Sequence, residues 1–581
     1  MMKKISTYFR VFAVLLMAGA AFSACSSEND EIDKQIEKKA ETGEWTMTVL
    51  LNKGEFEDTD NANKSSVSAT GTRSIGFSGS ETNLAAYWQQ GEEVKVVQMK
   101  DDKTGFEVIG TLKSKEYSST GATTLSGTLT KAPNNNGLMF YLHEAECDWT
   151  GQTGSLEDIS LHSDFALATL EQGEYVIDDK AKTVTISQGI KFKRMNAIVR
   201  FDFKDASGNE VKVKTLTIFD GGNTFNGEPA LYKTDDIVSK GKTYGDLVIN
   251  QQSANSRVFA SIHTTGNMNL VLKVEADDGS TYVYVPSQPV NFEAGKYYRI
   301  AVKLKKAIDL SKIKEEDTDD EDIYRINDGD IVTGTYNPHL LLNVAGGAKI
   351  TLCYATHNSA SPSGTSRSSG LTCDGDATIT LVGKNSFSGY QGAGIYVARE
   401  TTLTIKGTGT LIAKGYDGDM VFGAGIGAYS TANCGNIVIE GGTIIATGGY
   451  DCAGIGSGYS YSSTYDAYRS ECGYITISGG TVTATGKGEA AGIGCGFGGA
   501  CGNITITSGA KKVTATAGEE GGEYVQPIGI STDNGECISS CGDITIDGTT
   551  SWTAGTSTTN FNWTTGTVDN CRQWTLTNKK Q

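Results

Sequence analysis

Short runs of alternating apolar and polar residues fill the chain from Trp45 to about Leu304, and turn residues separate them at hairpin-like spacing. Residues 212–218 and 281–285 are typical examples. A period of two places successive side chains on opposite faces of a strand, whereas few stretches here repeat every 3.6 residues. The pattern predicts antiparallel β-sandwich structure for residues 45–304, a length that suits two sandwiches in tandem.

Residues 331–550 follow a different rule, because short motifs recur along them. Ala-Gly-Ile-Gly occurs at 424–427, 453–456 and 491–494, at intervals of 29 and 38 residues, and 393–396 is a degenerate copy. A second motif, Cys-Gly-x-Ile-x-Ile, begins at Cys434, Cys472, Cys501 and Cys541. A unit of about 29 residues cannot bury its apolar face alone, so units must stack.

Each unit reads as three short strands separated by glycine turns, which predicts a right-handed parallel β-helix of about six or seven coils. The expected fold class is therefore all-β, with tandem antiparallel β-sandwiches followed by the β-helix. Composition agrees, since 46 of the 72 glycines lie after residue 330 and the chain has only 7 prolines. The net charge of -18 argues against a nucleic-acid partner, because phosphate binding needs a cationic face.

The N-terminus has the pattern of an export signal at residues 1–24. Lys3, Lys4 and Arg10 accompany an apolar segment, 11–22, that is too short to span about 30 Å of hydrocarbon. The run Phe22-Ser23-Ala24-Cys25 resembles a bacterial lipobox, which implies lipidation of Cys25 and a tether at 25–44. We expect an outer-membrane protein that is held in the lipid through Cys25 and exposed at the surface. The alternative is an ordinary cleaved signal with a chance cysteine.

Three segments of the N-terminal half, 88–96, 195–203 and 292–300, resemble the fimbrillin family of pilus subunits and surface lipoproteins. The resemblance implies pilus subunits as partners and assembly by strand donation after an arginine-specific protease removes the N-terminal strand. Arg73 is the candidate processing site. A domain of about 250 residues after the closing strand departs from the family and favours a tip or stand-alone role.

Residues 305–330 are expected to form an acidic linker between the two halves. The run 314–322 lacks the spacing and turn glycine of a calcium loop, so solvated carboxylates are the better interpretation. Residues 551–581, with Trp552, Trp563 and Trp574, are predicted to cap the open end of the β-helix.

Cys434, Cys472, Cys501 and Cys541 occupy one repeat position, so stacking should place them about 4.8 Å apart. They can pair across coils, pair with Cys452, Cys495 or Cys537, or form a reduced ladder. The converging cysteine pairs of a zinc site are missing from the sequence, and we predict neither a metal nor a cofactor.

The 38-residue interval contains about nine extra residues within 459–469, and insertions in repeat proteins map to loops that often bind ligands. Sugar rings can stack on aromatic side chains, and charged groups can hydrogen-bond to their hydroxyls. The predicted binding residues are Tyr459, Tyr461, Tyr465, Asp466, Tyr468 and Arg469. The alternative is a surface loop without a function. The repeats also resemble glycine-rich β-helical modules of bacterial surface proteins, and members of this broader group are called carbohydrate-binding.

The leading hypothesis is a cell-surface lipoprotein that acts as an adhesin or pilus-associated protein, with a β-helix that binds a glycan or a host or partner surface protein. The alternative is a polysaccharide-degrading β-helix enzyme of the pectate-lyase type, and a third possibility is a structural pilus accessory. Asp374, Asp376, Asp417 and Asp419 would be the acidic candidates for catalysis, but they lie in turn-forming sequences. We therefore predict no catalytic residues.

Overall fold

The computed structural model describes two compact units, which are treated separately below. The residues described are 44–53, 57–58, 75–77, 84–103, 105–118, 121–134, 136–142, 150–186, 188–219, 246–262, 267–319, 322–336, 339, 341–360, 368–418, 422–460, 469–519, 525–533, 536–537, 539–547, 552–554 and 573–578. None of the helices in these ranges is long and apolar enough to cross a membrane.

The first unit contains a sheet in the order β10-β11-β1-β7-β6-β5-β8-β9-β13, with β12 also paired to β1. Its strands are β1 (Trp45–Asn52), β5 (Glu93–Met99), β6 (Phe106–Ser114), β7 (Ala122–Leu129), β8 (Leu138–Leu142), β9 (Ala166–Leu170), β10 (Tyr175–Asp178), β11 (Thr183–Ile186), β12 (Ile190–Lys191) and β13 (Lys193–Arg194). A hairpin of β3 (Ile75–Phe77) and β4 (Leu84–Ala86) lies outside this sheet. Most pairs are antiparallel, as expected, but β1 pairs in parallel with β11 and β12.

A sandwich in the second unit is built from two sheets. Its strands are β14 (Ala197–Lys204), β15 (Val213–Phe219), β16 (Leu247–Asn255), β17 (Arg257–Ile262), β18 (Val271–Ala276), β19 (Thr281–Tyr284), β20 (Lys296–Lys303) and β21 (Lys305–Asp309). One sheet contains β17, β14 and β20, and its β14–β20 pair is parallel. The other contains β16, β15, β18, β19 and β21, all antiparallel. Buried Phe201, Phe203 and Leu272 lie in the core of this sandwich.

The segment expected to be a linker is structured and joins this sandwich to the β-helix. Strand β21 pairs antiparallel with β19 and parallel with β23 (Ile331–Thr335), so one sheet continues from the sandwich into the first coil. Two short 3₁₀ turns, η3 (Leu310–Lys312) and η4 (Glu315–Asp317), and strand β22 (Ile323–Ile326) follow β21. The rings of Phe219 and Tyr354 stack at 3.8 Å across the junction. The acidic run takes part in this structure, because Glu315–Asp317 form η4 and the Asp319 carboxylate accepts a hydrogen bond from the Ile323 N–H at 3.0 Å.

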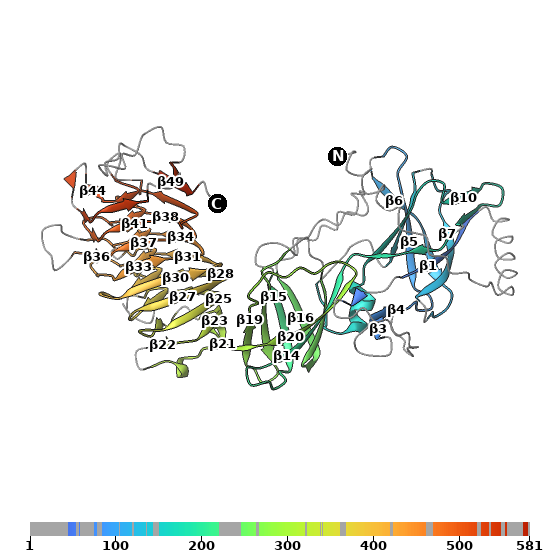
Figure 1. Cartoon of the computed structure of the whole chain (residues 1–581), viewed down its shortest axis with the longest axis horizontal. Coiled ribbons are helices and arrows are strands. Elements are labelled where there is room, and N and C mark those ends of the chain that lie inside the picture. The colour runs from blue at the N-terminus through green and yellow to red at the C-terminus, as the bar shows by residue number, and fades with distance from the viewer. Residues whose placement is uncertain are drawn as a thin grey trace. The chain divides into compact units, whose positions relative to one another are not determined.

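The β-helix has three walls of parallel strands (Figure 1). The first wall contains β22, β24 (Leu341–Val344), β26 (Leu371–Cys373), β29 (Ile395–Val397), β32 (Ile426–Gly427), β35 (Ile455–Gly456), β39 (Ile493–Gly494) and β43 (Ile528–Gly529). The second contains β23, β25 (Lys349–Asn358), β27 (Ala377–Val382), β30 (Thr402–Gly407), β33 (Asn436–Ile439), β37 (Ile475–Ile477), β41 (Ile504–Ile506) and β47 (Ile544–Ile546). The third contains β28 (Lys384–Ser388), β31 (Thr410–Lys414), β34 (Thr443–Thr447), β38 (Thr481–Thr485) and β42 (Lys512–Thr516). The predicted parallel stack is confirmed.

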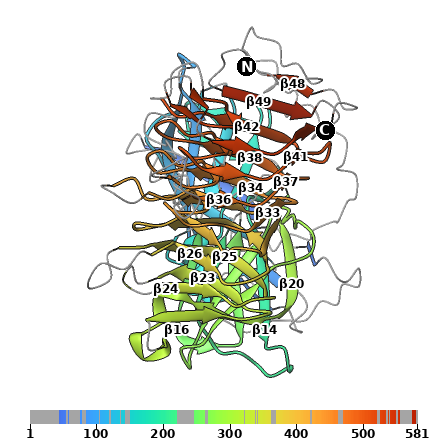
Figure 2. The ribbon, with the colours of Figure 1, turned by 90° about the vertical axis from the view of Figure 1, so that its left-hand side faces the viewer.

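Short strands at the corners and the C-terminus complete this domain. They are β36 (Glu471–Cys472), β40 (Ala500–Cys501), β44 (Thr532–Asp533), β45 (Glu536–Cys537), β46 (Ser540–Cys541), β48 (Trp552–Ala554) and β49 (Gln573–Asn578). Strand β49 pairs antiparallel with β42 at the end of the stack, where Figure 2 shows it in red above the coils. Trp574 lies in β49 opposite Ala515, whereas Trp563 lies outside the described residues.

Identical residues lie on top of one another inside the stack. Ile426 pairs in register with Ile455, and Ile455 with Ile493, although the two intervals differ by nine residues. All three side chains are fully buried. The second glycine of each motif is equally constrained, because Gly456 has a φ of 141° and a Cβ there would overlap the carbonyl oxygen of Gly494 in the next coil. Glycine is therefore required at this corner.

The substitution Gly456→Ala tests this constraint. We expect it to lower the free energy of unfolding by at least about 2 kcal/mol, because the methyl group both collides with the next coil and occupies a backbone conformation that alanine avoids. Denaturant titration of the full chain provides the measurement. Gly346→Ala is the matched control, since its Cβ would lie 3.6 Å from the Gly375 Cα in ordinary contact, and its effect should stay within about 0.5 kcal/mol. Equal effects of the two substitutions would contradict the stacking argument.

Candidate functional site

A row of aromatic side chains follows the corner of the β-helix beside the Ala-Gly-Ile-Gly strands. Tyr459 and Phe497 each come three residues after the end of such a strand, β35 and β39. Phe422 precedes β32, and Tyr450 precedes β35. We call Phe422, Tyr450, Tyr459 and Phe497 the aromatic row. Because equivalent corners of stacked coils lie side by side, the four rings meet although 75 residues separate the first from the last.

The rings contact one another along the corner. Tyr459 and Phe497 stack with their centroids 5.5 Å apart and an interplanar angle of 15°. Phe422 meets Tyr459 edge-on at 5.8 Å and meets Tyr450 at 5.5 Å. Tyr450 is 39% exposed, and the other three side chains are half-buried. These contacts hold each ring in a fixed orientation while leaving apolar surface open to solvent.

The predicted loop leaves the β-helix directly after Tyr459. Its two ends are tied together, because the main-chain N–H of Ser470 donates to Ser460 Oγ at 2.7 Å and that of Gly458 donates to Ser470 Oγ at 2.9 Å. Of the predicted binding residues, the structure therefore brings Tyr459 into the aromatic row. Arg469 lies at the other end of the loop, where its guanidinium contacts Ser540 Oγ.

Several predicted residues lie outside the described part of the chain. These are Cys25, Arg73, Tyr461, Tyr465, Asp466 and Tyr468.

Polar groups flank the aromatic row on neighbouring coils. Lys487 Nζ forms an ion pair with Asp417, which is bridged through its backbone to Phe422. Asp451 follows Tyr450, and its Oδ1 accepts a hydrogen bond from the Glu489 N–H at 2.9 Å. A sugar offers an apolar ring face with hydroxyl groups around its edge, so exposed rings beside carboxylate and ammonium groups match both of its surfaces.

Sequence reasoning missed Phe422, Tyr450 and Phe497. A signal was present, because an aromatic residue follows each Ala-Gly-Ile-Gly motif within three residues, at Tyr429, Tyr459 and Phe497. Tyr429 itself packs against Tyr396, with centroids 5.0 Å apart. Phe422 and Tyr450 lie beside these rings because of where the chain turns at each corner, and the motifs do not specify that position.

The acidic candidates for catalysis have other partners in the structure. Asp374 accepts hydrogen bonds from Asn343 Nδ2 at 3.1 and 3.0 Å and from Arg325 at 3.3 Å. Asp376 Oδ1 accepts from the Thr402 N–H of the next coil at 2.8 Å, so its carboxylate links two coils. Asp417 pairs with Lys487, and Asp419 lies outside the described residues.

The cysteines of the second repeat motif stack as predicted. Cys472 pairs in register with Cys501, and Cys501 with Cys541. The thiols of Cys472, Cys501 and Cys541 point toward the preceding coil, for example Cys501 Sγ toward the Gly473 carbonyl at 3.8 Å, whereas Cys434 Sγ points toward the Gly456 carbonyl of the following coil. Every cysteine whose side chain is described is a free thiol. Among the described residues, no group of three or more histidine, cysteine or acidic side chains is arranged to hold a metal ion.

One histidine is buried within the β-helix. His357 is fully buried, its Nε2 lies 3.1 Å from Ser359 Oγ, and its ring meets Tyr336 edge-on at 4.9 Å. Burial alone lowers the pKa of His357 to about 4. The neutral imidazole is therefore the form that the folded state favours.

Comparisons with known proteins give a family model and several solved structures with similarity to parts of the chain. A family model described as a beta helix repeat matches residues 403–428, 437–459 and 475–497, which are consecutive turns of the β-helix. No curated protein matches the chain.

Solved structures with detectable similarity include a protein from Bacteroides ovatus assigned to cell adhesion, at 12% identity and a TM-score of 0.27, covering 46% of this chain and 96% of that one. Another is the tip fimbrial protein Mfa3 from Porphyromonas gingivalis, at 10% identity and a TM-score of 0.22, covering 45% and 98%. A fimbrial protein from Bacteroides ovatus matches at 8% identity and a TM-score of 0.21, covering 46% and 50%. Fimbrial proteins and β-helix repeats are the two kinds of protein that the sequence motifs resemble.

The buried histidine predicts a pH-dependent stability. Above pH 6.5 the imidazole is neutral in both states, and as the pH falls from 6.5 toward about 4 only the unfolded state gains a proton, so the folded state loses stability. We expect His357 to make the domain about 2 kcal/mol less stable at pH 5 than at pH 7. Denaturant titrations at the two pH values should show a smaller difference for His357→Gln. The exposed His339 provides the control, and a pH difference that His339→Gln removes equally would contradict this assignment.

Proposed function

We propose that this protein is a cell-surface adhesin that is anchored in the outer membrane by a lipid on Cys25 and binds glycans through the aromatic row of its β-helix. The row and the loop that starts beside Tyr459 together form the contact surface. Residues 45–304 are the proposed stalk of the adhesin. Pilus subunits are the proposed assembly partners, with Arg73 as the proposed processing site.

The observation that supports glycan binding most directly is the half-exposed row of rings on a rigid corner. A ring that is already fixed by its neighbours loses little conformational entropy when a sugar stacks on it. The flanking Asp417–Lys487 ion pair contributes one negative and one positive group, which makes this surface mixed rather than strongly cationic. Neutral polysaccharides therefore suit it better than polyanionic ones.

Alanine substitutions along the row test the proposal. Phe497→Ala and Tyr450→Ala should each weaken retention on the bound glycan about tenfold, because each removes an aromatic face worth roughly 1–1.5 kcal/mol. The full chain would be screened on a glycan array and its binding then measured by titration with the retained glycan. Tyr474→Ala is the matched control, since Tyr474 is 43% exposed on the same β-helix but makes none of the ring contacts of the aromatic row.

The outcomes separate the alternatives. Loss of binding in the row variants but not in Tyr474→Ala supports the proposal. Shortening of the polysaccharide during incubation would instead support the degrading enzyme. Failure to retain any glycan, with normal adherence of cells to protein-coated surfaces, would indicate a protein ligand.

The lipid anchor has its own test. We expect Cys25→Ser to move the chain from the membrane fraction to the soluble fraction of lysed cells, because a serine hydroxyl cannot take the thioether-linked lipid. Immunoblotting of the two fractions measures the shift, and metabolic labelling with a fatty acid should lose its signal in parallel. Cys147→Ser is the control and should remain in the membrane fraction. Retention of Cys25→Ser in the membrane fraction would contradict the anchor.

A further inference from the structure

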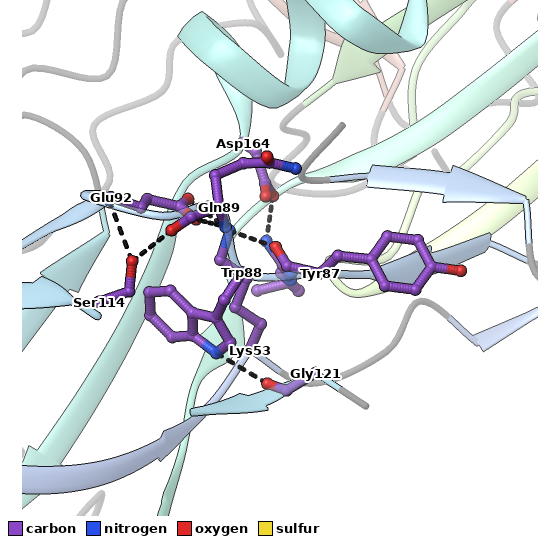
Figure 3. A network of polar contacts seen from close by, with 9 residues as sticks. Lys53, Tyr87, Trp88, Gln89, Glu92, Ser114, Gly121 and Asp164 are labelled. Atoms are coloured by element: carbon purple, nitrogen blue, oxygen red, sulfur yellow. Dashed lines mark hydrogen bonds and ion pairs between the residues drawn. The ribbon is translucent and has the colours of Figure 1, made fainter. Parts of the chain in front are cut away.

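A buried lysine and a buried glutamate meet in the first unit (Figure 3). Lys53 directly follows β1 and is fully buried, and Glu92, just before β5, is 7% exposed. Lys53 Nζ contacts Glu92 Oε1 and donates a hydrogen bond to the Tyr87 carbonyl at 2.8 Å. The ring of Trp88 lies 4.7 Å from Nζ and shields this contact. An amine and a carboxyl group therefore touch in a place that is largely shielded from water.

The two oxygens of the Glu92 carboxyl group have different surroundings. Oε1 faces Lys53 Nζ, whereas Oε2 accepts a hydrogen bond from the Gln89 main-chain N–H at 3.0 Å. A second hydrogen bond fixes the turn that contains Gln89 and Glu92, because the Glu92 main-chain N–H donates to Ser114 Oγ at 3.1 Å. A fixed N–H on one carboxyl oxygen stabilises the negative charge that develops there when a nucleophile attacks the carbon.

A second carboxylate completes the cluster. Asp164 is fully buried, its Oδ1 pairs with Arg194, and its Oδ2 has no hydrogen-bond partner among the described residues. Burial is the largest influence on Lys53 and lowers the pKa of its amine, while attraction to Glu92 and Asp164 acts in the opposite direction. Burial therefore favours the neutral amine, which is the nucleophilic form, more strongly here than on a protein surface.

We propose that Lys53 and Glu92 join in an intramolecular amide bond. Lys53 Nζ attacks Glu92 Cδ, the new C–N bond forms, and the bond from Cδ to Oε1 breaks. Two protons of the ammonium group leave with Oε1 as one water molecule, so the ion pair becomes a neutral amide and no oxidant or cofactor is consumed. Asp164 is the base that relays the proton from Nζ to the departing oxygen.

The bond would tie the end of β1 to the turn that precedes β5. Strand β1 lies inside the sheet between β7 and β11. The cross-link would therefore connect a central strand of the sheet covalently to the turn before β5. A covalent link of this kind restricts the unfolded chain and keeps β1 from being pulled out of the sheet. The inference concerns the first unit and is independent of the ligand proposed for the β-helix.

Peptide mass spectrometry of the full chain tests the proposal. We expect one joined peptide containing Lys53 and Glu92, lighter than the sum of the two by one water molecule, in most molecules. Lys53→Arg should abolish the joined peptide while keeping the positive charge, and circular dichroism would verify that the variant folds. Glu92→Gln should give the same joined mass as the wild type, since the amide releases ammonia instead of water.

One further variant and one control pair make the test specific. Asp164→Asn should slow the appearance of the joined peptide by roughly 100-fold, the contribution typical of a proton-transfer group. Lys95 and Glu93 are the matched control pair, because their charged atoms lie 3.3 Å apart but the side chains are 33% and 43% exposed, and we expect no joined peptide from them. Recovery of separate, unmodified peptides with Lys53 and Glu92 from the folded wild-type chain would overturn the proposal.

Discussion

The hydrogen-bond ladder between successive coils decides what each position of the β-helix can hold. Parallel strands lie about 4.8 Å apart, so every residue in a wall touches its own equivalent in the coils above and below. An isoleucine column such as Ile426, Ile455 and Ile493 packs well under this rule, and a glycine column permits close approach of backbones at the corner. A side chain that suits one coil but not its neighbours disturbs both, which explains why the repeat tolerates so little variation inside.

The same ladder creates a difficulty at its two ends, where an unpaired strand would expose its backbone groups. At the first coil, β23 pairs with β21, which is also an edge strand of the neighbouring sandwich. At the last coils, β49 returns in the antiparallel direction and pairs with β42. The sandwich in the second unit is therefore a cap of the β-helix, and the packing of Phe219 against Tyr354 reinforces the junction.

Much of the β-helix could be predicted from the sequence because equivalent positions of every coil require the same kinds of residue. The registers of Cys472 with Cys501 and of Ile455 with Ile493 follow directly from aligning the motifs. The parallel pairing of β1 with β11 could not be predicted, since alternation with a period of two is the same in both directions. Strand β21 was missed because the dense carboxylates after it dominate the composition of 305–330, and because its own sequence, two lysines followed by Ala307, Ile308 and Asp309, does not alternate between polar and apolar residues.

The candidate site lies at a corner of the β-helix, where the hydrogen-bond ladder between coils restricts the residues least. Coils separated by 29 and by 38 residues keep the same register in their walls, so the nine additional residues must leave the stack at a corner. They leave after Tyr459, beside rings contributed by three different coils. The length of the chain at this corner can therefore differ without changing the register of any wall, because the rings of the aromatic row are held by contacts with one another. Fixed rings thus lie beside a point where the chain can lengthen without altering the register of any wall, so a rigid surface and a tolerant position occur together.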